Sequence, residues 1–97
     1  MRILAIDYGT KRVGLAVSDP TGVLASPLRT LNNDGLEKLL EKLVTVVREV
    51  SAERVLVGVP VRTDGSLREE ARRVLNFAHR LSARIEVPVT SIDEAFT

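Results

Sequence analysis

The sequence predicts an α/β fold organised around one sheet. Five apolar segments have the length of β-strands, and two longer segments carry apolar residues at the spacing of amphipathic helices. Along the chain the order is strand, strand, strand, helix, strand, helix, strand. No internal repeat or convincing linker divides the chain, so its 97 residues are expected to form one small domain over 1–97.

The first two strands are expected to form a hairpin. Residues 3–6 are apolar without alternation, as in a strand buried on both faces of a sheet. Gly9 relaxes the backbone restriction at the turn, and residues 13–17 can return as the antiparallel partner. Residues 23–28 read as a third strand. Pro27 places that strand at an edge of the sheet, because proline cannot donate a ladder hydrogen bond.

A helix and an interior strand follow. Apolar residues recur at helical spacing over 36–50, and Asp34 and Glu37 resemble a capping arrangement at the start of this helix. Residues 54–59 form a short apolar run that predicts a strand inside the sheet.

The second helix is predicted from a capping box. Residues 66–69 have the S-x-x-E spacing, so the helix is expected to start there. Its buried face is predicted to consist of Leu67, Ala71, Val74, Leu75, Ala78 and Leu81. The other face is basic through Arg73, Arg80 and Arg84, for which a solvated surface is the simpler explanation and RNA binding the alternative. Residues 87–92 supply the last strand.

Asp7 ends the first strand and is the first candidate for chemistry. An isolated buried carboxylate is very costly, so this one must be hydrogen-bonded, paired, bound to a metal or able to reach water. Lys11 and Arg12 fall in the turn close to it. Mixed charge at a strand end suits a site for a metal ion and a phosphate group. The alternative is a solvated aspartate in a structural hairpin.

Composition narrows the kind of site. The chain has no cysteine and a single histidine, His79, which excludes disulfide scaffolds and thiolate zinc sites and argues against a Ser-His triad. Any metal must therefore be held by oxygen. The formal net charge is only +1, so local basic patches must carry any binding of nucleic acid. No apolar run resembles a membrane span or a secretory leader, so a cytoplasmic location is expected.

Three motifs in order resemble one known family. The pattern D-x-G-x-x-R-x-G-x-A-x-S-D, which starts at Asp7, resembles the YqgF/RuvX family of RNase H-like proteins, relatives of Holliday junction resolvases. Residues 57–60 followed by 64–66 are similar to the family's glycine-proline strand end and its D-G-S helix start. Residues 92–94, Ile-Asp-Glu, resemble the acidic motif that closes the next strand.

The resemblance implies an RNase H-like five-stranded mixed sheet in the order 3-2-1-4-5, with the second strand antiparallel to the rest. In this order the ends of strands 1, 4 and 5 lie together, where open α/β sheets usually place their ligands. Asp7, the 60–66 loop, Asp93 and Glu94 would then meet at one edge of the sheet.

The function that the resemblance implies is a metal-dependent nuclease, a hydrolase that processes precursor 16S rRNA in ribosome biogenesis, with branched DNA junctions as an older suggestion. Phosphodiester cleavage needs an activated water and stabilised phosphate charge, which divalent ions supply, and Mg²⁺ and Mn²⁺ prefer oxygen ligands. The expected metal ligands are Asp7, Glu94 and, as an alternative, Asp93, with Asp7 and Glu94 catalytic. The residues expected to hold backbone phosphates are Lys11, Arg12 and Arg62.

Other functions stay open. Family members usually continue past the acidic motif into a helix that supplies a further acid, whereas this chain stops at Thr97. A non-catalytic nucleic-acid-binding or ribosome-assembly module is therefore an alternative, and a sheet face without helices would favour a homo-oligomer. Residues 7–10 also resemble the phosphate loop of actin-like ATPases and sugar kinases. Those enzymes close two lobes around a nucleotide, for which 97 residues leave little room.

Overall fold

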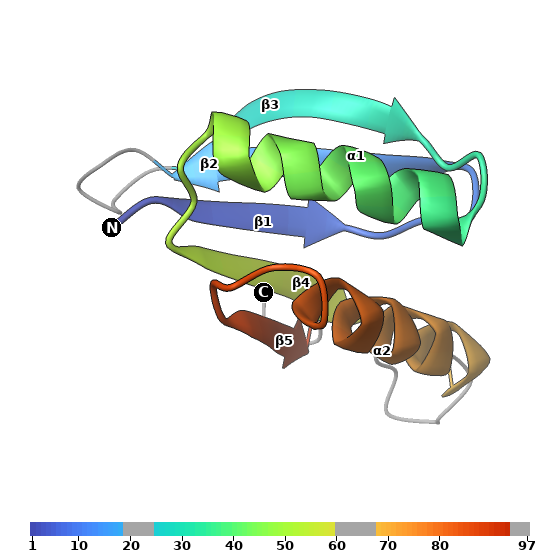
Figure 1. Cartoon of the computed structure of the whole chain (residues 1–97). Helices are drawn as coiled ribbons and strands as arrows, with labels where there is room; N and C mark the ends of the chain where they lie inside the picture. Colours follow the sequence, from blue (N-terminus) through green and yellow to red (C-terminus); the bar gives the residue numbers. More distant parts are fainter. Residues whose placement is uncertain (19–24, 60–67, 94–97) are drawn as a thin grey trace.

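The computed structural model describes residues 1–18, 25–59 and 68–93 (Figure 1). Its elements are β1 (Ile3–Asp7), β2 (Arg12–Ser18), β3 (Ala25–Asn32), α1 (Leu36–Glu49), β4 (Arg54–Val59), α2 (Arg68–Ser82) and β5 (Val89–Asp93). They match the predicted elements in kind and order, although β3 ends later along the chain than the predicted residue 28, and the predicted start at residue 23 lies outside the described residues. Within these ranges no helix is long and apolar enough to cross a membrane.

The strands form one sheet in the order β3-β2-β1-β4-β5. β2 runs antiparallel to both β1 and β3, whereas β1 and β5 each run parallel to β4. The predicted strand order and the predicted direction of β2 are therefore confirmed. So is the edge position of β3, where Pro27 lies opposite Ala16 beside an irregularity in the ladder. Parallel pairing puts the carboxyl ends of β1, β4 and β5 at the same edge of the sheet.

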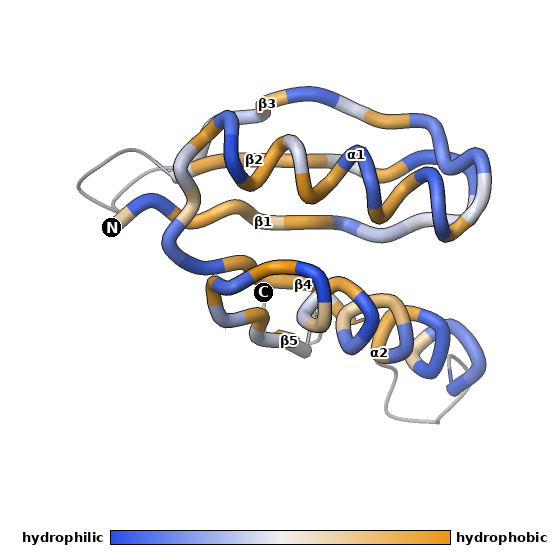
Figure 2. The backbone as a smooth tube through the Cα atoms, viewed as in Figure 1, coloured by the Kyte–Doolittle hydropathy of each residue, from blue (hydrophilic) through white to orange (hydrophobic). Residues whose placement is uncertain are grey.

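Both helices pack on the same face of the sheet, with α1 over β1 to β3 and α2 against β4 and β5 (Figure 1). Figure 2 shows that β1, β2 and β4 are largely hydrophobic, whereas polar residues line the outer turns of the helices. The core between the two layers includes Leu4, Ile6, Val13, Leu15, Val55 and Val57 from the strands and Leu39, Leu40, Leu43, Val74, Phe77 and Leu81 from the helices. Burying these side chains is the main favourable contribution to folding.

The other face of the sheet, named the open face, carries no helix from the described ranges. Leu4 and Ile6 of β1 are buried under the helices, whereas Ile3 and Ala5, which alternate with them, are half-buried on the open face. The prediction that the first strand is buried on both faces is therefore wrong. An unalternating apolar run does not fix the number of covered faces, which depends on where the helices pack.

The helices differ from prediction in one cap and one buried side chain. No side chain caps α1: its N-cap residue is Gly35, with φ of 114°, and Asp34 instead lies 3.6 Å from the Lys42 ammonium. In α2, Leu75 is 47% exposed and Phe77 is only 1% exposed, so the predicted buried face was wrong at this point. The rotation of a helix about its axis decides which of several neighbouring positions is buried. An apolar residue just outside the buried stripe then faces water.

Exposed ion pairs occupy several basic residues of α2. Glu37 of α1 lies 3.8 Å from Arg80 and also contacts Arg84, and Arg72 lies 3.6 Å from Glu69. Such exposed pairs are worth at most about 1 kcal/mol each. They supply acidic partners for part of the basic face, which favours a solvated helix surface over RNA binding.

Candidate active site at the end of the first strand

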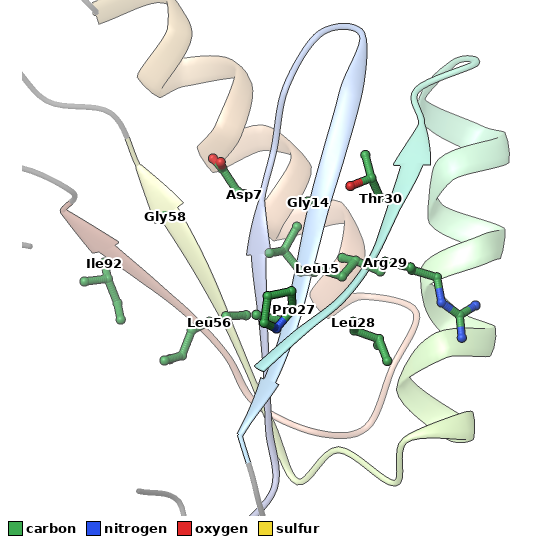
Figure 3. Close-up of a pocket in the computed structure, with 13 residues that line it drawn as sticks. Asp7, Gly14, Leu15, Pro27, Leu28, Arg29, Thr30, Leu56, Gly58 and Ile92 are labelled. Carbon is green, nitrogen blue, oxygen red and sulfur yellow. The ribbon is translucent and has the colours of Figure 1, made fainter. Parts of the chain in front are cut away.

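Asp7, the last residue of β1, lies in a line of residues that crosses the open face. It pairs with Gly14 of β2, and the next step of the parallel β1–β4 ladder puts Gly58 on its other side. Outward from the two glycines, Gly14 pairs with Thr30 and Gly58 with Ile92. We name these five residues, one from each strand, the Asp7 row (Figure 3). A carboxylate in the centre of the sheet is thus flanked by two residues without side chains.

The Asp7 carboxylate is exposed and projects from the end of β1 (Figure 3). Within the described ranges, no hydrogen bond or ion pair engages it. Among the ways in which a carboxylate can be stabilised at a strand end, the structure therefore supports contact with water, which also leaves its oxygens accessible to a cation.

An aromatic contact fixes the backbone directly after Asp7. The Tyr8 ring stacks on Phe77 of α2, with ring centroids 4.5 Å apart and an angle of 20° between the ring planes. Stacked aromatic pairs of this kind add to the stabilisation that burial supplies. Because Phe77 belongs to the helix layer, Tyr8 ties the end of β1 to one face of the sheet while Asp7 emerges on the other.

The turn after Tyr8 is held at the end of β3. The side-chain amide of Asn33 donates to the Gly9 carbonyl oxygen at 2.8 Å, and the Asn33 backbone N–H donates to the Lys11 carbonyl oxygen at 2.9 Å. A Cβ atom on Gly9 would overlap the carbonyl oxygen of Arg12, so only glycine fits this turn without a backbone shift. Sequence reasoning assigned 32–35 only to a chain break and missed the role of Asn33, for which the sole signal was the ability of asparagine to bond to turn backbone.

Lys11 and Arg12 lie at this turn, as predicted, and both are exposed. Arg12 opens β2 two residues before Gly14, so strand alternation puts it on the open face with Asp7. In the described part of the chain neither side chain forms an ion pair. Both are therefore available to an anion that approaches Asp7 from the hairpin side.

Asp93 comes to the same edge of the sheet. It is the last residue of β5 and pairs with Val59 at the end of β4. Since only β4 separates β1 from β5, the strand ends that carry Asp7 and Asp93 are about 10 Å apart, or two strand spacings. The strand order brings these two strand ends to one edge of the sheet, whereas a shared site of Asp7 and Asp93 stays a prediction, since Ile92, and not Asp93, occupies the Asp7 row.

The other predicted site residues, Glu94 and Arg62, lie outside the described ranges, as does the whole 60–66 loop. Among the residues that are described, no three acidic or histidine side chains come close enough together to hold a metal ion. Of the predicted acids, Asp7 is therefore the one on whose side-chain position the description of the site rests.

A groove of about 750 Å³ runs along the open face beneath Asp7. Its lining includes Ala5, Ala16 and Leu56 from the inner strands together with the whole Asp7 row (Figure 3). This volume falls in the range of pockets that bind small organic ligands. Apart from Asp7, the lining that lies near β1 is apolar or bare backbone, so the carboxylate is the chemical focus of the groove.

The order 3-2-1-4-5 with an antiparallel second strand is that of an RNase H-like fold, and this chain carries an acid at the end of the central strand. Among solved structures, the chain resembles T. thermophilus RuvC in complex with a Holliday junction substrate, with a TM-score of 0.70 and 17% identity over 98% of this chain and 66% of that one. At this identity the likeness concerns the fold.

Sequence comparisons place the chain within that class. The family described as "RuvX: Holliday junction resolvase" matches residues 1–97. A protein of Desulforamulus reducens is 36% identical over 97% of this chain and 69% of its own length, and one of Moorella thermoacetica is 40% identical over 100% and 69%. Both carry the name "Putative pre-16S rRNA nuclease". The chain belongs to the RuvX family.

Proposed function

We propose that this chain acts as a metal-dependent nuclease on structured RNA in the cytoplasm, with precursor 16S rRNA as its substrate. The observation that carries the proposal is the exposed Asp7 carboxylate, without a partner in the described ranges, at the end of the central strand of an RNase H-like sheet. The names of the RuvX-family relatives supply the kind of substrate.

The residues fit a divalent cation of the hard, oxygen-binding kind. Asp7, with Glu94 or Asp93 from the end of the β5 segment, would hold Mg²⁺ or Mn²⁺, because the chain offers carboxylates at this edge and no cysteine anywhere. When bound, such an ion lowers the pKa of a coordinated water and offsets charge on the phosphate. Lys11, Arg12 and Arg62 would hold phosphates on either side of the cleaved bond, which fixes the position of the strand without reading its sequence.

A second candidate is a nucleic-acid-binding module of ribosome assembly that does not cut. It is favoured by the exposed Lys11 and Arg12, which form no ion pair in the described ranges and can hold phosphates whether or not a bond is cut. Both candidates require binding of RNA phosphates at the Asp7 edge, and they differ in whether a bond is broken.

The deciding experiment is a cleavage assay on precursor 16S rRNA, a four-way DNA junction and ATP, with Mg²⁺, with Mn²⁺ and with EDTA. We expect metal-dependent cutting of the rRNA, reduced about 100-fold or more in Asp7→Asn, since losing one group that stabilises transition-state charge costs that much. Asp34→Asn is the matched control, because Asp34 is an exposed acid paired with Lys42 away from the groove. Full cutting by Asp7→Asn would remove Asp7 from the mechanism, whereas RNA binding without cutting would establish the second candidate.

A further inference from the structure

One arginine on the basic face of α2 has no acidic partner in the described ranges. Arg80 and Arg84 both contact Glu37 at the start of α1. Arg73 precedes Arg80 by two helical turns, so it lies on the same face of α2 but about 10 Å further along the axis, away from Glu37. Its side chain is exposed, and no described residue forms an ion pair or a hydrogen bond with it. The guanidinium of Arg73 is therefore available to an anion.

Arg73 lies near the end of β1 that carries Asp7. It precedes Phe77 by one helical turn, about 6 Å along the helix axis. The Phe77 ring in turn stacks on Tyr8, the residue after Asp7, with the ring centroids 4.5 Å apart. Figure 1 shows the first turns of α2 and the β1–β2 turn projecting past the end of β1 in the same direction. Arg73 therefore stands in the helix layer, beside the hairpin that Asp7 opens.

Cations without ion pairs in the described ranges thus flank the end of β1 in both layers of the fold. Arg12 lies on the open face and Lys11 in the turn, whereas Arg73 lies in the helix layer. Residues 8–12, which form the turn between the layers, include no acid that would repel a phosphate. A sugar–phosphate backbone that meets Asp7 on the open face and continues around this turn would pass Arg12, then Lys11, then Arg73.

We infer that Arg73 is a further phosphate-binding residue, which extends the path of the nucleic acid from the open face, around the β1–β2 turn, to the helix layer. The inference rests on the proposed function, whose substrate it follows beyond Asp7. Arginine suits this role because its planar guanidinium can donate two parallel hydrogen bonds to one phosphate. Such a contact positions the backbone without reading its sequence.

The test measures binding separately from cleavage. Fluorescence anisotropy in EDTA would give the affinity for a labelled single-stranded RNA over a range of salt concentrations. Arg73→Gln should lower the slope of log K against log salt by about 0.7, the value for one lost phosphate contact. Arg73→Lys keeps the charge and should keep the slope. Arg72→Gln is the matched control, because Arg72 is the neighbouring exposed arginine of the same helix and lies 3.6 Å from Glu69. Its slope should equal that of the parent.

The outcomes separate this inference from the proposed function. An unchanged slope in Arg73→Gln would overturn the inference even if Asp7→Asn abolished cutting. Equal falls in Arg72→Gln and Arg73→Gln would also overturn it, because the RNA would then respond to the net charge of α2 and not to a contact at Arg73. A fall confined to Arg73→Gln would support the inference even if no substrate were cut. If a substrate is cut, Arg73→Gln should raise KM and leave kcat unchanged, the result expected for a residue that binds substrate and transition state equally.

Discussion

Tyr8 and Phe77 stack 4.5 Å apart and join the end of the central strand to the second helix. The contact lies next to Asp7 in the sequence but on the opposite face of the sheet. It follows that the position of the carboxylate depends on packing that no ligand touches, so damage to this contact should affect both stability and the site.

Removing the helix side of this contact should destabilise the fold. Phe77 is 1% exposed, so Phe77→Ala should lower the free energy of unfolding by about 3–5 kcal/mol, the usual cost of emptying an aromatic site in a core. Leu75→Ala is the control, because Leu75 on the same helix is 47% exposed and should cost much less. Urea denaturation measures both. Equal losses would mean that α2 packs in a different phase.

Two glycines of the hairpin should differ in how much a methyl group destabilises the fold. Gly9→Ala places its Cβ on the Arg12 carbonyl oxygen and should cost about 1–3 kcal/mol through overpacking, whereas Gly14→Ala meets only an ordinary contact and should leave stability almost unchanged. Thermal unfolding followed by circular dichroism compares them directly. A Gly9→Ala protein as stable as the parent would show that the turn relaxes freely.

Asp7→Asn should leave the fold intact and weaken metal binding. No described residue bonds to this carboxylate, so its neutralisation removes no internal interaction, while a cation loses a charged ligand. Calorimetric titration with Mn²⁺ should show a loss of affinity of about tenfold or more. Asp34→Asn should bind Mn²⁺ like the parent. Equal affinity of Asp7→Asn and the parent would locate the ion elsewhere.

Lys11 and Arg12 should account for part of the salt dependence of RNA binding. Replacing both by glutamine removes two cations that form no ion pair within the described ranges. The slope of log K against log salt for single-stranded RNA should therefore fall by about 1.4, at 0.7 for each phosphate contact. The control replaces Arg80 and Arg84, which are engaged with Glu37 and should leave the slope unchanged. If the slope fell only in the control variant, the RNA would be bound at α2 instead of at the hairpin.

The sequence predicted the elements well, because their signals are local. The apolar run at 54–59 and the helical spacing from residue 36 coincide with β4 and α1 almost residue for residue. The strand order came from the family motifs, since no local pattern carries it. Two features could not be predicted from local sequence patterns, for a physical reason. The open face depends on the side of the sheet on which both helices pack, and the placement of Gly58 one step beyond the Ile6–Val57 pair depends on the register between strands distant in sequence.

β5 is an edge strand that pairs only with β4 in the described sheet. Asp7 comes from the first strand of the chain and Asp93 from the last, at the outer edge of the sheet. The helix-covered core includes residues of β1, β2 and β4, so these strands can hold together before β5 docks. Local opening of that edge strand would then dismantle the acidic edge while the rest of the protein stays folded, and hydrogen exchange would register β5 amides opening ahead of those in β1. The proposed activity could then be lost while the free energy of global unfolding stays unchanged.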